Sequence, residues 1–130
     1  MLFRSECLEN SWDGSILCFE DAHRDPRWSF AKTNEEGLVV EVQEKVPISQ
    51  YATAGMYAFS KGIDFVQASL DMIVRNERVN GEFYTCPTYN YLIAEKKKIG
   101  MHLIHQDSMH DLGTPEGLEA YLETMILQRA

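Results

Sequence analysis

The apolar positions of this chain fall into short runs that are typical of strands and longer segments with the period of about 3.6 residues of helices. The short runs are bounded by turn residues, as at Asp13-Gly14 before the first of them. The second and third runs flank Asn34-Glu35-Glu36-Gly37, a turn-forming tetrapeptide that predicts a β-hairpin. The predicted strands are 15–19, 28–33, 38–42, 52–59 and 98–105.

The first helical segment follows Ser60, a good N-cap residue, and is closed by Arg75-Asn76-Glu77. Its apolar residues fall on one stripe, and we expect this stripe to face the core. The members of the stripe are Ile63, Val66, Leu70, Ile73 and Val74.

A second, shorter helix is expected from about Pro87 to the lysines before Gly100. The last helix has the clearest start, because Gly113 turns the chain, Thr114 is an N-cap residue and Pro115 suits the first helical position. The face of the last helix that we expect to be buried consists of Leu118, Tyr121, Leu122, Met125 and Ile126.

Strands interleaved with helices predict an α/β fold, a mixed Rossmann-like sheet flanked by helices with a β-hairpin excursion. Residues 1–130 are expected to form a single domain, because 130 residues with 45% hydrophobic side chains are typical of one folded domain. Residues 1–13 carry no pattern that places them.

The formal net charge of -8 argues against nucleic acid as a partner, because phosphate backbones are bound by clustered Lys and Arg. No apolar stretch approaches the about 20 residues that cross a bilayer, so we expect no membrane partner and a cytoplasmic location. The cysteines, Cys7, Cys18 and Cys86, lack C-x-x-C spacing and predict reduced thiols.

Four short motifs occur in order: Glu44-Lys45, then Ala-Thr-Ala-Gly-Met-Tyr at 52–57, then Gly81-Glu82, then Asp-Leu-Gly-Thr-Pro at 111–115. In this order and at these distances they resemble the back half of a sugar-1-phosphate nucleotidyltransferase. The resemblance runs from about residue 14 to 122. No Gly-rich turn, phosphate-binding Lys or early metal-binding Asp precedes the motifs, so the resemblance implies a truncated C-terminal half of such an enzyme that is inactive alone.

The resemblance assigns Glu44 and Lys45 to the sugar phosphate. A carboxylate can accept hydrogen bonds from sugar hydroxyls, and a neighbouring ammonium can meet the phosphate. An ordinary surface ion pair is the alternative.

The resemblance also places Thr53, Gly55 and Tyr57 on the sugar-side strand. Small residues there would let backbone groups reach a ligand, and Tyr57 would wall the pocket; a tightly packed internal strand is the alternative. Glu82 is implied to hold the sugar with Asn90 as its hydrogen-bonding neighbour, or else it caps a turn.

Asp111 resembles the second metal-binding Asp of the family, which would bind Mg²⁺ only if a second ligand came from elsewhere. A turn Asp before a capped helix is the alternative. A histidine metal site is not expected, since His102 and His105 are three apart in a predicted strand and point to opposite faces.

The first functional hypothesis is a nucleotidyltransferase-like domain that retains a partial sugar-phosphate site. The alternatives are a self-associating scaffold without a ligand, and the C-terminal subunit of a split sugar nucleotidyltransferase. Missing neighbouring strands would leave an apolar sheet edge, so we expect a homo-oligomer or a separate N-terminal half as partner.

Overall fold

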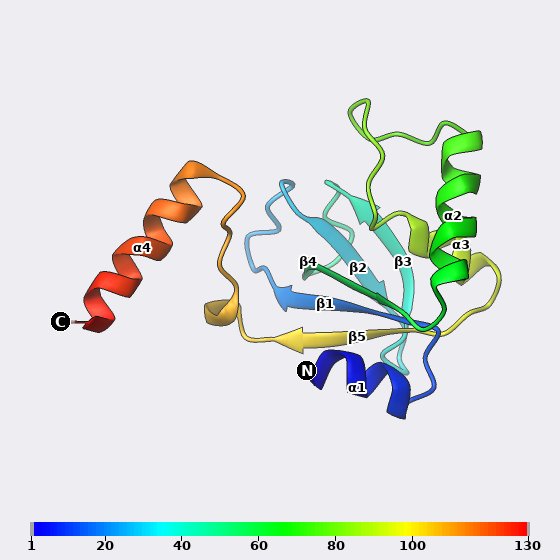
Figure 1. The fold of residues 1–130 in the computed structure, drawn as a ribbon, viewed down its shortest axis with the longest axis horizontal. Helices are drawn as coiled ribbons and strands as arrows, with labels where there is room; N and C mark the ends of the chain where they lie inside the picture. The colour runs from blue at the N-terminus through cyan, green and yellow to red at the C-terminus, as the bar shows by residue number, and fades with distance from the viewer. Residues whose placement is uncertain (1, 130) are drawn as a thin grey trace.

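The fold of residues 2–129, the part of the chain that the computed structural model describes, is a five-stranded mixed sheet with helices around it (Figure 1). The strand order is β3-β2-β4-β1-β5; β5 runs parallel to β1, and the other neighbouring strands are antiparallel. The α/β mixed sheet and the hairpin predicted from the sequence are confirmed. The elements are α1 (Leu2–Glu9), β1 (Gly14–Glu20), β2 (Ser29–Thr33), β3 (Val39–Glu44), β4 (Tyr51–Phe59), α2 (Gly62–Val74), α3 (Thr88–Ala94), β5 (Ile99–Ile104), the short 3-10 helix η1 (Gln106–Ser108) and α4 (Pro115–Arg129).

The hairpin of β2 and β3 forms because Asn34 organises its turn. The Asn34 Oδ1 atom accepts hydrogen bonds from the backbone N–H groups of Glu36 and Leu38, both at 3.0 Å. Asn side chains commonly stabilise turns in this way. Antiparallel pairing then places Glu44 opposite Ser29 at the far end of the hairpin, where the candidate site begins.

The core lies between the sheet and helices α2 and α3, and Tyr89 is its largest fully buried side chain. The Tyr89 ring stacks on Phe59 with centroids 4.6 Å apart, and its O–H donates to the carbonyl oxygens of Ser15 and Ala58 at 3.1 and 2.8 Å. Gly14 permits this arrangement, because a Cβ there would lie 2.9 Å from the Tyr89 ring. These contacts fix α3 on β1 and β4.

Helix α2 begins slightly later in the chain than its predicted cap. Lys61, not Ser60, is the N-cap residue, and it makes no side-chain cap bond. Ser60 instead donates its O–H to the Trp12 carbonyl oxygen at 2.5 Å. Asp64, in the first turn of α2, is 6% exposed, and its Oδ1 atom lies 2.6 Å from Nζ of Lys97. This ion pair ties α2 to the segment after α3.

The apolar stripe predicted to be buried on α2 is exposed. Its five side chains are 47–84% exposed, whereas the buried residues of the helix are Asp64, Ala68 and Met72. The prediction was wrong because an apolar stripe shows that a helix face can pack, but not which element covers it.

The predicted buried face of α4 is likewise open. Leu118, Leu122 and Ile126 are 44%, 51% and 67% exposed, and Tyr121 and Met125 are half-buried. In Figure 1 this helix stands away from the sheet, which explains why the face lacks cover within the described residues. Within residues 2–129, no helix combines the length and the apolar character that crossing a bilayer requires.

The N-terminal segment that the sequence left unplaced contains α1, which packs on β1 and β5. The indole of Trp12, just after this helix, lies directly on Gly100 of β5. A Cβ at residue 100 would be 1.9 Å from the Cε3 atom of Trp12, so the contact requires glycine.

Candidate functional site

A main cleft of about 430 Å³ lies where β2, β3 and β4 meet the segment that precedes α4. Five of the candidate residues from the sequence line it: Glu44, Thr53, Gly55, Tyr57 and Asp111. The remaining lining residues are Arg27, Trp28, Ser29, Ala54, Tyr84, Thr85, Cys86, Met109, His110 and Leu112. Residues that are far apart in the sequence therefore share one cleft.

Glu44 is the last residue of β3 and is 7% exposed. Its Oε2 atom accepts a hydrogen bond from the O–H of Ser29, its partner residue on β2. A buried carboxyl group is costly unless hydrogen-bonded, so Ser29 is the residue that allows Glu44 to occupy the floor of the cleft.

The groups around Glu44 are neutral. Burial raises the pKa of the Tyr57 phenol above its ordinary range, and neighbouring Cys86 adds to the effect. Burial, followed by the charge of Glu44, raises the pKa of the Cys86 thiol to about 12. The hydroxyls of Tyr57 and Thr53 are 3.0 Å apart and hydrogen-bonded. The floor therefore presents protonated hydroxyl and thiol groups, and Cys86 is not an activated nucleophile.

Strand β4 bulges where it borders the main cleft. Ile16 pairs with Tyr57 and Cys18 pairs with Thr53, so the single residue Leu17 of β1 lies opposite the segment 54–56 of β4. Gly55, inside this bulge, has a φ of 76°, and no atom lies within 4 Å of the position that a Cβ would take. The left-handed backbone conformation favours glycine here, and the bulge leaves backbone groups exposed beside the cleft.

Lys45 lies beside the main cleft rather than in its lining. Its backbone has a φ of 58°, in the left-handed region, and its N–H donates to the Trp28 carbonyl oxygen at 3.0 Å. Its Nζ atom lies 5.4 Å from the centroid of the Tyr84 ring, which does line the cleft. The left-handed turn separates Lys45 from the neighbouring Glu44.

Glu82 lies in a neighbouring cavity of about 220 Å³, which shares Glu44 and Tyr84 with the main cleft. Its carboxylate accepts the Tyr84 O–H at 2.8 Å. Asn90 was predicted to be the hydrogen-bonding neighbour of Glu82, but it bonds to Val42 instead. The Asn90 Oδ1 atom accepts the Val42 N–H at 3.0 Å, and its Nδ2 atom donates to the Val42 carbonyl oxygen at 2.9 Å. Asn90 therefore caps the edge of β3 instead.

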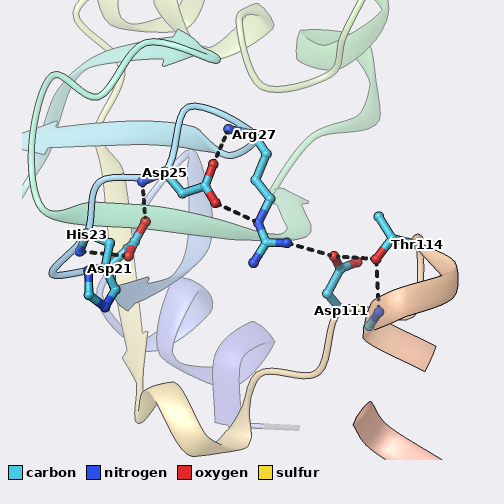
Figure 2. A network of polar contacts seen from close by, with 7 residues as sticks. Asp21, His23, Asp25, Arg27, Asp111 and Thr114 are labelled. Carbon is cyan, nitrogen blue, oxygen red and sulfur yellow. Dashed lines mark hydrogen bonds and ion pairs between the residues drawn. The ribbon is translucent and has the colours of Figure 1, made fainter. Parts of the chain in front are cut away.

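Asp111 holds the turn that starts α4 (Figure 2). Its Oδ1 atom accepts the N–H of Gly113 at 3.0 Å, and its Oδ2 atom accepts the O–H of Thr114 at 3.2 Å. Thr114 in turn accepts the N–H of Gly117 at 3.1 Å, so Thr114 caps the helix as the sequence predicted. Both carboxylate oxygens of Asp111 thus have local partners.

Asp111 is the carboxylate of the main cleft that the resemblance links to a metal ion. No group of three or more His, Cys, Asp or Glu side chains among the described residues is arranged to hold a metal ion. Asp111 contributes a single carboxylate, and Mg²⁺ bound there would take its remaining ligands from water, substrate phosphate or another chain.

Arg27 is a residue of the site that the sequence did not suggest. Its guanidinium stacks over the Trp28 ring at 4.6 Å. Its Nε atom lies 3.2 Å from Oδ2 of Asp25, and its Nη1 atom lies 3.7 Å from Oδ2 of Asp111 (Figure 2). Arg27 and His110 both line the main cleft, where no lysine does. The residues around Arg27, Asp25 to Trp28, have no periodic pattern or motif that could have assigned them to a site.

A second cavity of about 320 Å³ lies between the loop after β1, η1 and α4. Asp21 is 4% exposed and shapes this loop, because its carboxylate accepts the backbone N–H groups of His23 and Asp25 at 3.0 and 2.7 Å (Figure 2). The residues common to both cavities are Arg27, Trp28, Met109, His110 and Asp111. The Arg27–Asp111 pair therefore stands between the two.

No protein-family model matches the chain, and no curated protein sequence matches it. Comparison with solved structures finds 117 matching chains. One is the nucleoside-diphosphate-sugar pyrophosphorylase from Vibrio cholerae RC9, with a TM-score of 0.80 and 29% identity over 89% of this chain and 48% of that chain.

Another is the CMP:2-keto-3-deoxy-manno-octonic acid synthetase complexed with CTP, with a TM-score of 0.62 and 14% identity over 98% of this chain and 55% of that chain. This chain therefore spans about half the length of the solved proteins it matches. The fold is nucleotidyltransferase-like.

Proposed function

We propose that the main cleft binds the sugar-phosphate portion of a nucleotide sugar or of its sugar-1-phosphate precursor. The observation that carries the proposal is the convergence of Glu44, the β4 bulge and Asp111 on one cleft of suitable size. The name of the Vibrio cholerae protein supports this ligand class, since that protein acts on nucleoside-diphosphate sugars and shares the fold.

The sugar would lie over the floor of the cleft. Glu44 uses one oxygen for Ser29, and no partner for its other oxygen is found among the described residues. That oxygen can accept a sugar hydroxyl in a charge-assisted hydrogen bond. Thr53 and the backbone groups exposed at Gly55 supply further neutral partners, which together would orient the ring.

The phosphate would lie toward Arg27 and His110, which also line the main cleft. A guanidinium suits phosphate because it donates two parallel hydrogen bonds. The Lys45 ammonium lies over the Tyr84 ring at the side of the cleft and would attract the phosphate from a longer distance. The carboxylates of Asp25 and Asp111 lie near Arg27 and would repel a phosphate. Mg²⁺ bound to Asp111, with a second ligand from elsewhere, would offset this negative charge and strengthen phosphate binding.

The proposal assigns only the sugar-phosphate side of nucleotidyl transfer to this chain, because the chain spans about half the length of the proteins it matches. Turnover would then require a further polypeptide segment that holds the nucleoside triphosphate, and in a split enzyme this segment is a separate chain. A ligand-free scaffold, in contrast, would bind no sugar phosphate at all.

Titration calorimetry with a panel of sugar-1-phosphates, with and without Mg²⁺, tests the proposal. Glu44→Gln should weaken binding about tenfold or more, which corresponds to the loss of about one charged hydrogen bond. Glu41→Gln is the matched control, because Glu41 lies on the same strand but outside the cleft lining.

Melting curves of both variants show whether the fold is intact. Absence of heat and of a thermal shift with every sugar phosphate would refute the proposal in favour of the scaffold. Equal weakening in both variants would remove Glu44 from the site.

A further inference from the structure

Helix α2 is apolar on two opposite faces. One face carries Ala68 and Met72 and is buried against the core. The other face, the α2 stripe, has no cover within the described residues; it consists of Ile63, Val66, Leu70, Ile73 and Val74, which are 55%, 47%, 56%, 50% and 84% exposed. Apolar side chains on two opposite faces are typical of a helix that is packed on both sides.

The spacing of the α2 stripe indicates what kind of element it fits. Ile63, Val66, Leu70 and Ile73 are separated by three, four and three positions. Apolar residues at this spacing form the seam along which two helices pack with knobs in holes, as in coiled coils. A second helix is therefore the natural partner, rather than an extended strand or a small ligand.

We infer that the α2 stripe pairs with the α2 stripe of a second copy of this chain. The positions that flank the seam, Gln67 and Ser69, are uncharged, and so is Val74 at its end. Two copies of a chain with a net charge of -8 can therefore meet along this face without placing like charges opposite each other. Pairing about a two-fold axis also makes one patch complementary to itself.

The exposed area is sufficient for such a pair. From their exposed fractions, the five side chains present about 500 Å² of apolar surface, so two copies would bury about 1,000 Å², near the lower limit of a specific interface. An apolar patch of this size is also at the upper end of what a monomer exposes. The expected dimer is consequently one in exchange with monomer.

Helix α2 is held more firmly on the body of the protein than α4 is, which favours pairing through α2. The Asp64–Lys97 ion pair and the buried Ala68 and Met72 hold α2 on the body of the protein, whereas no described side chain of α4 is buried. Pairing through an ordered helix loses less conformational entropy. In Figure 1, α2 lies at the end of the molecule remote from α4, and no α2 residue lines either cavity of the candidate site.

Sedimentation equilibrium of the full chain tests the inference. The wild type should be largely dimeric at about 100 µM, and Leu70→Lys should weaken dimerisation at least about thirtyfold because a charge in the seam cannot be solvated there. Leu122→Lys is the matched control, since Leu122 on the open face of α4 is 51% exposed against 56% for Leu70. Val74→Lys should also weaken the dimer, and its 84% exposure makes damage to the monomer fold negligible.

If the wild type stays monomeric up to about 0.5 mM, the inference is wrong and the α2 stripe would instead bind a different protein. Dimers that persist in Leu70→Lys and Val74→Lys but dissociate in Leu122→Lys would overturn it in favour of α4. If two copies instead paired along the sheet edge at β5, the dimer would survive the α2 substitutions but dissociate when Leu103 is replaced by a charged residue. That result would also overturn the inference. None of these results depends on a sugar phosphate being bound.

Discussion

Replacing Lys97 by methionine isolates one interaction on which the position of α2 depends. The Asp64 carboxyl is 6% exposed, and its Oδ2 atom is buried without a hydrogen-bond partner. Its Oδ1 atom lies 2.6 Å from Nζ of Lys97, whose side chain is 24% exposed and also lies 3.1 Å from Glu95. The hydrogen bond with Asp64 raises the pKa of Lys97, so its ammonium stays charged at neutral pH.

Lys97→Met should lower the free energy of unfolding by about 2–3 kcal/mol. Breaking a buried pair by removing one partner costs about 3–5 kcal/mol, and the partial exposure of Lys97 reduces that cost through solvent screening. For a chain of this length the loss corresponds to a decrease in melting temperature of about 10 °C. Urea denaturation followed by circular dichroism measures it.

Lys98→Met is the control, because Lys98 is an exposed neighbour of Lys97. If the cost arises from an unpaired Asp64, adding Asp64→Asn to Lys97→Met should restore part of the stability, and the double-mutant cycle should show a coupling of about 1 kcal/mol or more. A Lys97→Met variant within about 0.5 kcal/mol of the control would refute the reasoning.

Two further changes probe packing and ionisation. Gly100→Ala should destabilise the fold by about 1–3 kcal/mol, because the added Cβ would lie 1.9 Å from the Trp12 ring; a melting temperature equal to that of the wild type would contradict this. Burial and the hydrogen bond to Glu77 raise the pKa of Tyr91 to about 12, above its ordinary value of 10.0. The unfolded chain therefore releases this proton first, so the stability it contributes is complete below about pH 10 and is lost toward pH 12. Tyr91→Phe should flatten that part of the stability profile, and an unchanged slope would count against the shift.

Local patterns predicted the elements of the fold well. The compact apolar run at 15–19 became β1, and the alternation over 52–59 became β4. The turn at Asn34 became the hairpin that positions Glu44. Such features depend on residues close in sequence, whose side chains alternate or cap regardless of the rest of the chain. Ser60 failed as a cap because a contact with Trp12, distant in sequence, engages its hydroxyl.

The candidate site was only partly accessible to such reasoning. The motifs that resemble a nucleotidyltransferase identified Glu44, Gly55 and Asp111, which the fold brings into one cleft. Lys45 and Glu82 lie beside that cleft because of a left-handed turn and a hydrogen bond to Tyr84. The motifs did not indicate the other lining residues, among them Arg27, Ser29, Cys86 and His110.

From residue 14 onward the sequence by itself determined the order and type of the strands and of the three α-helices, together with the hairpin turn, the cap of the last helix and the net negative charge. The tertiary structure decided which apolar faces are covered and which polar side chains meet. The physical reason is that periodicity and turn chemistry act over a few residues, whereas burial and convergence depend on strand register and on helix packing between distant segments. The α2 stripe shows the difference, since its pattern predicted a buried face and only the fold revealed that this face is open.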